Sequence, residues 1–212
     1  MSVTRADISS RGPRPLDPIE RLRQARLGAF FRPSQLAEAG LSPDRLRALV
    51  GSGAVQRVGR GLYRMAEAEP TADYSLAMAS ARVPNSIVCL LSALRVHGIG
   101  TQSPAEVWLG IPHKARAPRL AGLRLRLVRF TGPAWTYGVK PIEFEGVPAR
   151  ITSPARTVVD CFRFERLVGP EVAVEALRDG LRRRLVTVAE LSRVEQTLPS
   201  RRLRAALDVR IA

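Results

Sequence analysis

Hydrophobic residues in the first third of the chain recur at helical spacing in three short stretches, each bounded by residues that start or stop helices. Ser42 followed by Pro43 is the clearest start signal, because serine caps a helix amino terminus and proline fits its first turn. Gly40 is the clearest stop signal, since glycine readily adopts the left-handed conformation that ends a helix. We therefore expect three helices, from Pro18, over Pro33–Ala39 and over 43–52.

After the third helix, the pattern and the turn residues change to those of strands. Residues 54–58 and 62–65 are typical of two strands, and Gly59-Arg60-Gly61 between them is a tight hairpin signal. Helices followed by a β-hairpin form a winged helix-turn-helix, which we expect over residues 16–66. Residues 1–15 show no periodicity and are expected to be a flexible tail.

Residues 67–212 are expected to form a larger domain of mixed α and β content, so the fold class of the whole chain is predicted to be α+β. Two helices come first, near Tyr74–Arg82 and before His97. Strands and then further helices follow, which is the order typical of the α+β class. The predicted strands lie around 107–111, 123–127, 142–144 and 147–151, and the later helices cover 154–162, 171–184 and 187–196.

The charge of the chain indicates what the protein binds. The formal net charge is +15 and the calculated pI is about 11.5, as expected of a protein that binds a phosphate backbone. Residues 1–66 carry 12 arginines against 5 acidic residues, so the amino-terminal domain has the higher density of positive charge. We therefore look for a DNA-contacting face there first.

In a winged helix-turn-helix, the third helix enters the major groove of DNA and the wing contacts the adjacent backbone. The exposed positions of the expected third helix, its cap, the second helix and the wing are therefore candidate DNA contacts. The alternative is that their charges are simply solvated, on a winged helix that binds protein. The candidates are Ser34, Gln35, Ser42, Asp44, Arg45, Arg47, Arg57, Arg60 and Arg64.

Candidate catalytic chemistry is sparse. His97 is expected to close a helix, where its charge suits the helix dipole, and His113 to lie in an exposed basic loop. Cys89 and Cys161 stand alone in apolar stretches and are expected to be buried thiols. We expect no catalytic residues, no metal and no cofactor. We also expect no signal peptide and no membrane span, hence a cytoplasmic protein.

One polar pair in the second domain has two interpretations. Arg156 and Asp160 are four residues apart on one predicted helix, a spacing that allows an ion pair. The pair either ties this helix to the sheet or belongs to a functional surface of the second domain.

Several motifs in serial order resemble one family. They include Val58-Gly59-Arg60-Gly61-Leu62-Tyr63-Arg64 in the first domain and, in the second, Val83-Pro84-Asn85, the Thr152–Phe162 segment and Val174-Glu175-Ala176-Leu177-Arg178-Asp179. Over roughly residues 28–195, the chain resembles the AbiEi family of type IV antitoxins. The Ser-Pro-Ala-Arg-Thr part of the Thr152–Phe162 segment also resembles proteins that append an endonuclease module, but the acidic cluster and Glu-x-Lys signature of that module do not follow here.

The resemblance implies a repressor of its own operon. Such antitoxins bind inverted repeats in double-stranded DNA through the winged helix. They counter a neighbouring nucleotidyltransferase-like toxin through the larger domain, without a stable complex. Two alternatives stay open: a stand-alone winged-helix regulator whose larger domain senses a ligand or partner, and an enzyme, either a nuclease or a nucleotidyltransferase.

Overall fold

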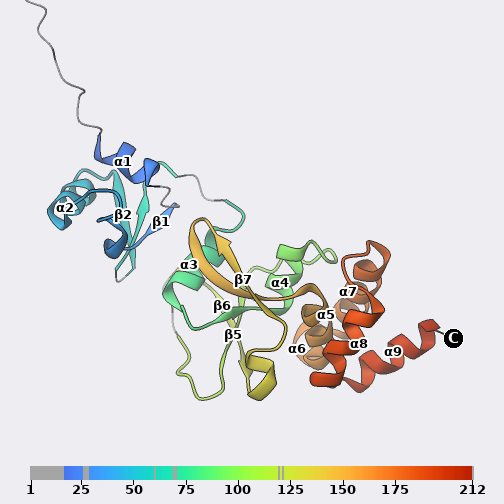
Figure 1. The fold of residues 1–212 in the computed structure, drawn as a ribbon. Coiled ribbons are helices and arrows are strands. Elements are labelled where there is room, and N and C mark those ends of the chain that lie inside the picture. The colour runs from blue at the N-terminus through green and yellow to red at the C-terminus, as the bar shows by residue number, and fades with distance from the viewer. Residues whose placement is uncertain are drawn as a thin grey trace, which may run out of the picture. The chain divides into compact units, whose positions relative to one another are not determined.

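The computed structural model describes residues 17–25, 29–59, 61–68, 71–118, 120 and 122–211 (Figure 1). The chain divides into two compact units, residues 1–68 and 69–212. Each unit has a hydrophobic core of its own. The expected tail, 1–15, lies outside the described residues.

The first unit has short helices around a small antiparallel sheet. Its elements in chain order are α1 (Pro18–Gln24), β1 (Phe30–Phe31), the 3₁₀ helix η1 (Pro33–Gln35), α2 (Pro43–Gly51), β2 (Val55–Gly59) and β3 (Leu62–Met65). The strand order is β1-β3-β2. Leu22, Leu36, Leu46 and Val55 meet in the core, so α1, the residue that ends η1, α2 and the sheet all contribute to it.

The prediction of a two-turn helix over Pro33–Ala39 is wrong. Only Pro33–Gln35 is helical, as a 3₁₀ turn, and the chain continues in turns to Gly40. The amides of Ala39 and Gly40 donate three residues back, at 3.1 and 3.0 Å, which is the tighter 3₁₀ pattern. A seven-residue stretch is too short to sustain an α-helix by itself, so the burial of Leu36 decides its path.

Strand β1 was not predicted, and its pairing makes the β2–β3 hairpin part of a three-stranded sheet. Phe30 pairs with Arg64 and Phe31 with Tyr63, so β3 is the middle strand of the sheet. Two residues are too few to give a period-two pattern. The strand forms because both phenylalanines are buried, at 1% exposure each.

The second unit has a five-stranded mixed sheet with helices packed beside it (Figure 1). The strand order is β6-β5-β4-β8-β7, in which β5/β6 and β4/β8 are parallel and the other pairs antiparallel. The elements are α3 (Tyr74–Arg82), β4 (Ile87–Val88), α4 (Leu90–His97), β5 (Val107–Pro112), β6 (Leu125–Phe130), η2 (Gly132–Trp135), β7 (Val139–Phe144), β8 (Val147–Thr152), α5 (Pro154–Arg163), α6 (Glu165–Val168), α7 (Pro170–Arg182), α8 (Val188–Thr197) and α9 (Arg201–Ile211).

Helix α5 is the centre of this unit. It packs against α4, α7 and α8, and its residues from Ala155 to Phe162 are all buried. Ser153 caps it by accepting from the Arg156 amide, as its Ser-Pro start signal predicts. The α+β class is confirmed, while β4, η2, α6 and α9 were not predicted as elements. In the described part of the chain, no helix has the length and apolar character needed to cross a membrane.

Candidate nucleic-acid interface

Helix α2 presents one face to the core and the opposite face to solvent. The Ser42 hydroxyl accepts from the Arg45 amide at 3.3 Å and so caps the helix. Leu46 and Leu49 are buried, as the helical spacing predicts. Because these two side chains fix the rotation of the helix, the exposed side chains of its first two turns are Pro43, Asp44, Arg45, Arg47 and Ala48.

The exposed face of α2 contains an ion pair. Arg47 Nη1 lies 2.5 Å from Asp44 Oδ1, and the two side chains are 80% and 83% exposed. A pair so open to solvent adds little to stability, but it holds the Arg47 guanidinium over the first turn of the helix. Asp44 therefore lowers the positive potential of the face that Arg45 and Arg47 create.

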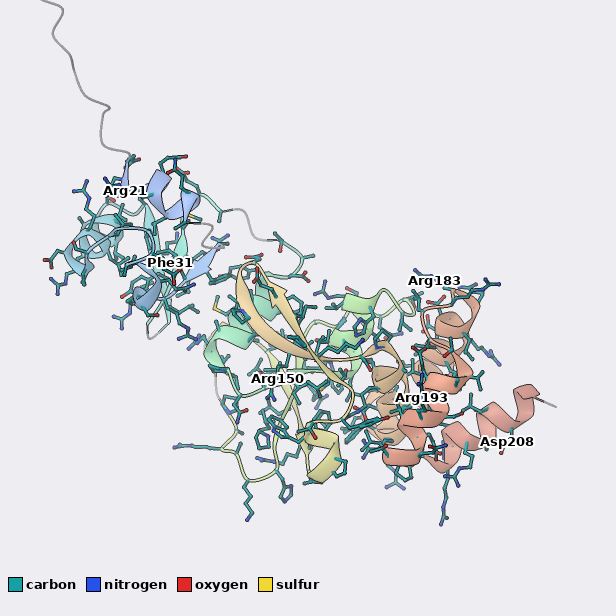
Figure 2. The ribbon with its side chains drawn as sticks, in the orientation of Figure 1. Arg21, Phe31, Arg150, Arg183, Arg193 and Asp208 are labelled. Carbon is teal, nitrogen blue, oxygen red and sulfur yellow. The ribbon has the colours of Figure 1, made fainter. Side chains whose placement is uncertain are left out.

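A hollow of about 550 Å³ lies at the amino-terminal end of α2, between this helix and α1. Arg45 lines it from α2 and Arg21 from α1, where Arg21 Nη1 is 3.5 Å from the Gly40 carbonyl oxygen (Figure 2). Sequence reasoning missed Arg21, because α1 was searched only for its apolar stripe. The residues that line the hollow are Asp17, Pro18, Arg21, Gly40, Leu41, Ser42 and Arg45.

The wing is the turn between β2 and β3. Arg57 is exposed near the end of β2, and Gly61 has a φ of +63°, which a glycine adopts without strain. Arg60 lies outside the described residues.

The prediction that the wing displays Arg64 is wrong. Arg64 is only 6% exposed and donates to the carbonyl oxygen of Ala68 within the same unit. It lies on the middle strand, between Phe30 of β1 and Gln56 of β2, and so is not on an open wing. The expectation failed because pairing with β1 is not visible in the local pattern.

The other two candidates lie on η1. Ser34 is exposed, whereas Gln35 is half-buried and its Oε1 accepts from the Arg32 amide at 2.8 Å. That side chain is part of the cap of η1. The structure therefore brings Ser42, Asp44, Arg45 and Arg47 together on α2, with Arg21 beside them.

Arg156 and Asp160 form an ion pair that is fully buried. Arg156 Nε is 2.7 Å from Asp160 Oδ2, and both side chains have 0% exposure. The other guanidinium nitrogens of Arg156 donate to the carbonyl oxygens of Ala134 and Tyr137, while Arg163 Nη1 donates to Asp160 Oδ1 at 2.8 Å. The interpretation of this pair as a functional surface is therefore corrected, since a group without exposure presents no surface.

The histidines and cysteines have structural surroundings. His97 Nε2 lies 2.7 Å from the Thr152 carbonyl oxygen, and burial lowers the pKa of the imidazole. His97 therefore links the end of α4 to β8, while His113 is exposed. Cys89 and Cys161 are buried free thiols, and burial raises the pKa of both. Within the described residues, no three His, Cys, Asp or Glu side chains are grouped to hold a metal ion.

The first unit thus has the helices and β-hairpin of a winged helix, with arginines on the solvent-facing side of the third helix. Residues 20–66 match the sequence model of the family described as "Transcriptional regulator, AbiEi antitoxin". The match confirms the family resemblance over that segment of the first unit.

Comparison with solved structures extends the likeness to the fold of most of the chain. The chain is similar to the crystal structure of the RV2827C protein from Mycobacterium tuberculosis, with a TM-score of 0.54 and 19% identity, covering 84% of this chain and 69% of that chain. At this identity, the likeness shows the fold alone. Comparison with curated proteins gives no match.

Proposed function

We propose that this chain is the antitoxin of a type IV toxin–antitoxin system, a non-enzymatic repressor that binds double-stranded operator DNA in front of its own operon. The observation that carries the proposal is the exposed face of α2 within a domain of the AbiEi antitoxin type. Arg45 and Arg47 stand on that face, where the third helix of a winged helix meets the major groove. Arginine is well suited to guanine edges there.

The hollow beside α2 supports a phosphate contact in the same complex. Ser42 and the first turn of α2 offer a helix amino terminus, which favours an anion, and Arg21 and Arg45 add two positive charges. A backbone phosphate at this position would fix the register of α2 in the groove. Ser34 and Arg57 remain proposed backbone contacts, based on their positions on η1 and at the wing, and Arg60 remains one on its place in the sequence alone.

The larger unit is proposed to counter a nucleotidyltransferase-like toxin encoded by the neighbouring gene, without a stable complex between the two proteins. Co-expression of the chain with that gene should restore growth. A growth rescue that persists when α2 is disabled, in the Arg45→Ala/Arg47→Ala variant, would separate antitoxin action from repression. Loss of rescue in this variant would mean that the larger unit does not act by itself.

The test of DNA recognition is fluorescence anisotropy of the full chain with the duplex upstream of its gene and with a scrambled duplex, across a salt titration. Preference for the native duplex that survives physiological salt is the expected result. Equal, salt-sensitive binding to both duplexes would contradict operator recognition and leave only the attraction of a basic protein to phosphate.

Arg45→Ala should weaken binding to the native duplex by about 1–3 kcal/mol, the usual range for an arginine that reads a guanine edge. The Arg45 side chain is exposed, so the substitution should leave the fold intact. Equal losses on the native and scrambled duplexes in the same anisotropy assay would mean that Arg45 contacts only phosphate.

A stand-alone regulator that senses a small ligand is the second candidate function. An open hollow of about 870 Å³ along α7, lined by Glu175, Arg178 and Arg182 among others, is the observation that favours it. Operator binding that responds to a metabolite, together with a neighbouring gene that is not toxic when expressed, would favour this candidate over the antitoxin.

A further inference from the structure

The positive charge of the larger unit is concentrated in one stretch of sequence. Between Glu106 and Glu143 there are seven Lys and Arg residues and no acidic residue, whereas the remainder of 67–212 has 15 Lys and Arg against 14 acidic residues. Nearly all of the excess charge of this unit therefore lies on β6, the loop before it and the start of β7. The seven are Lys114, Arg116, Arg119, Arg124, Arg126, Arg129 and Lys140.

Strand β6 forms an edge of the five-stranded sheet, because it pairs only with β5. Along this strand, Arg126 and Arg129 are exposed, while Val128 and Phe130 are buried. The positive charges thus follow the solvent side of an edge strand. Charges at this place also discourage pairing with another strand, which is one structural reason for them.

One of these arginines fixes the loop before β6. Arg129 Nη1 donates to the carbonyl oxygens of Pro112, His113 and Ala115, the last at 2.8 Å, and the His113 amide donates to the Phe130 carbonyl oxygen at 3.1 Å. The start of the loop is therefore held against the end of β6. Its exposed cations, Lys114 and Arg116, are displayed from a backbone with a defined course.

The other exposed cations of this stretch have few contacts with oxygen atoms of the protein. In the described part of the chain, no carboxylate forms an ion pair with Lys114, Arg116 or Arg124, all of which are exposed. Arg126 lies over the Trp108 ring at 5.5 Å and reaches Glu106 at 3.3 Å, yet half of its side chain is open to solvent. Figure 2 shows nitrogen-tipped side chains standing out from the loop between β5 and β6.

We infer that these four residues, Lys114, Arg116, Arg124 and Arg126, form a second duplex-DNA contact surface, here named the β6 basic face. A loop and a sheet edge rich in arginine suit the phosphate backbone, and the described residues from 113 to 130 include no helix that could enter the major groove. The face therefore adds affinity and salt dependence rather than sequence preference. This inference rests on the proposed function, because a duplex bound by the winged helix is at a raised effective concentration for the rest of the same chain.

The test compares two full-length variants that carry the same reduced net charge. One is Lys114→Gln/Arg116→Gln/Arg124→Gln on the β6 basic face. The control is Arg166→Gln/Arg193→Gln/Arg201→Gln, on exposed helix positions of the same unit. Binding to the upstream duplex and to a scrambled duplex of equal length is measured by anisotropy across a salt titration. The slope of log affinity against log salt should fall by about 0.9 for each phosphate that the variant no longer neutralises.

We expect the first variant to neutralise two to three fewer phosphates on both duplexes, and the control to keep the slope of the original protein. Equal slopes for the two variants would overturn the inference. If only the proposed operator recognition fails, the protein binds both duplexes with equal affinity, but the salt slopes of the two variants still differ. An RNA duplex of the same sequence is the third arm: if the slope difference appears on RNA and not on DNA, the assignment to DNA is wrong.

Discussion

Arg47 and Arg156 each face an aspartate on their own helix, but burial gives the two pairs different roles. The Asp44–Arg47 pair is open to water, where the attraction between the charges is screened. The Arg156–Asp160 pair has no exposure, and Arg156 has an acceptor for each of its three guanidinium nitrogens. Arg47 can therefore leave Asp44 to bind a ligand, whereas Arg156 and Asp160 maintain the fold.

Replacement of Arg156 by Met should destabilise the larger unit by about 3 kcal/mol, near the lower end of the range for a broken buried ion pair. Asp160 would remain buried with Arg163 as its only charged partner, and the carbonyl oxygens of Ala134 and Tyr137 would lose a donor. Urea unfolding measures the change. Arg47→Met, which breaks the exposed pair, is the control and should cost less than about 1 kcal/mol; equal costs would contradict the role assigned to burial.

Asp44→Asn should tighten DNA binding by up to about fivefold, since two unit charges about 4 Å apart in water interact by roughly 1 kcal/mol. The substitution removes a negative charge from the exposed face of α2 and releases Arg47 from its ion pair. Anisotropy with the upstream duplex is the measurement. Asp208→Asn on α9 changes the net charge equally and should leave affinity unchanged (Figure 2); weaker binding by Asp44→Asn would instead show that the carboxylate contacts a base.

Elements with local start signals were predictable from the sequence, and those that depend on distant partners were not. Ser42-Pro43, Ser153-Pro154 and the capping box of Thr187 with Glu190 each start a helix where expected. The same helical spacing also predicted which residues of α2 face solvent. In contrast, β1 exists only through its pairing with β3, so the burial of Arg64 could not be foreseen. Arg21 was not predicted as a site residue, because the hollow that it lines forms only where α1 packs beside α2 in the folded unit.

The link between α7 and the loop after α4 should make stability depend on pH. Asp179 accepts from the Gly100 amide at 2.9 Å and pairs with Arg182 and Arg183, which together lower its pKa from 3.8 to about 2. Because the pKa is lower in the folded state, the stabilisation is complete above about pH 5 and is lost as the pH falls from about 4 towards 2.

Urea unfolding of the protein and of Asp179→Asn at several pH values measures this effect. The variant should be less stable at pH 7 and should lose less stability on acidification. If acidification destabilises both proteins equally, the loop link does not titrate as described.

At the scale of the whole molecule, the two units have separate cores. Buried residues of the first core lie between Leu22 and Val55, and those of the second between Ile87 and Leu207. Both tryptophans, Trp108 and Trp135, belong to the second unit, so their fluorescence reports on that unit. We therefore propose that the two units unfold independently.

Leu46→Ala should destabilise the first unit by about 2–5 kcal/mol, because it leaves a cavity in the smaller core. Tryptophan fluorescence should keep its original transition, while far-UV circular dichroism shows an earlier phase. Leu191→Ala in the second core is the matched control and should shift the fluorescence transition. A fluorescence shift in Leu46→Ala would mean that the units unfold as one.

The surroundings of Arg156 have a consequence for how the larger unit opens. Its guanidinium joins α5 to η2 and to the segment at Tyr137, and it lies 5.1 Å from the Phe130 ring at the end of β6. None of these segments can detach alone without leaving a dehydrated charge or carbonyl without its partner. We therefore expect sub-global opening of 130–138 to be suppressed, so that the sheet edge, η2 and the central helix open as one cooperative unit and their amides show similar protection in hydrogen exchange.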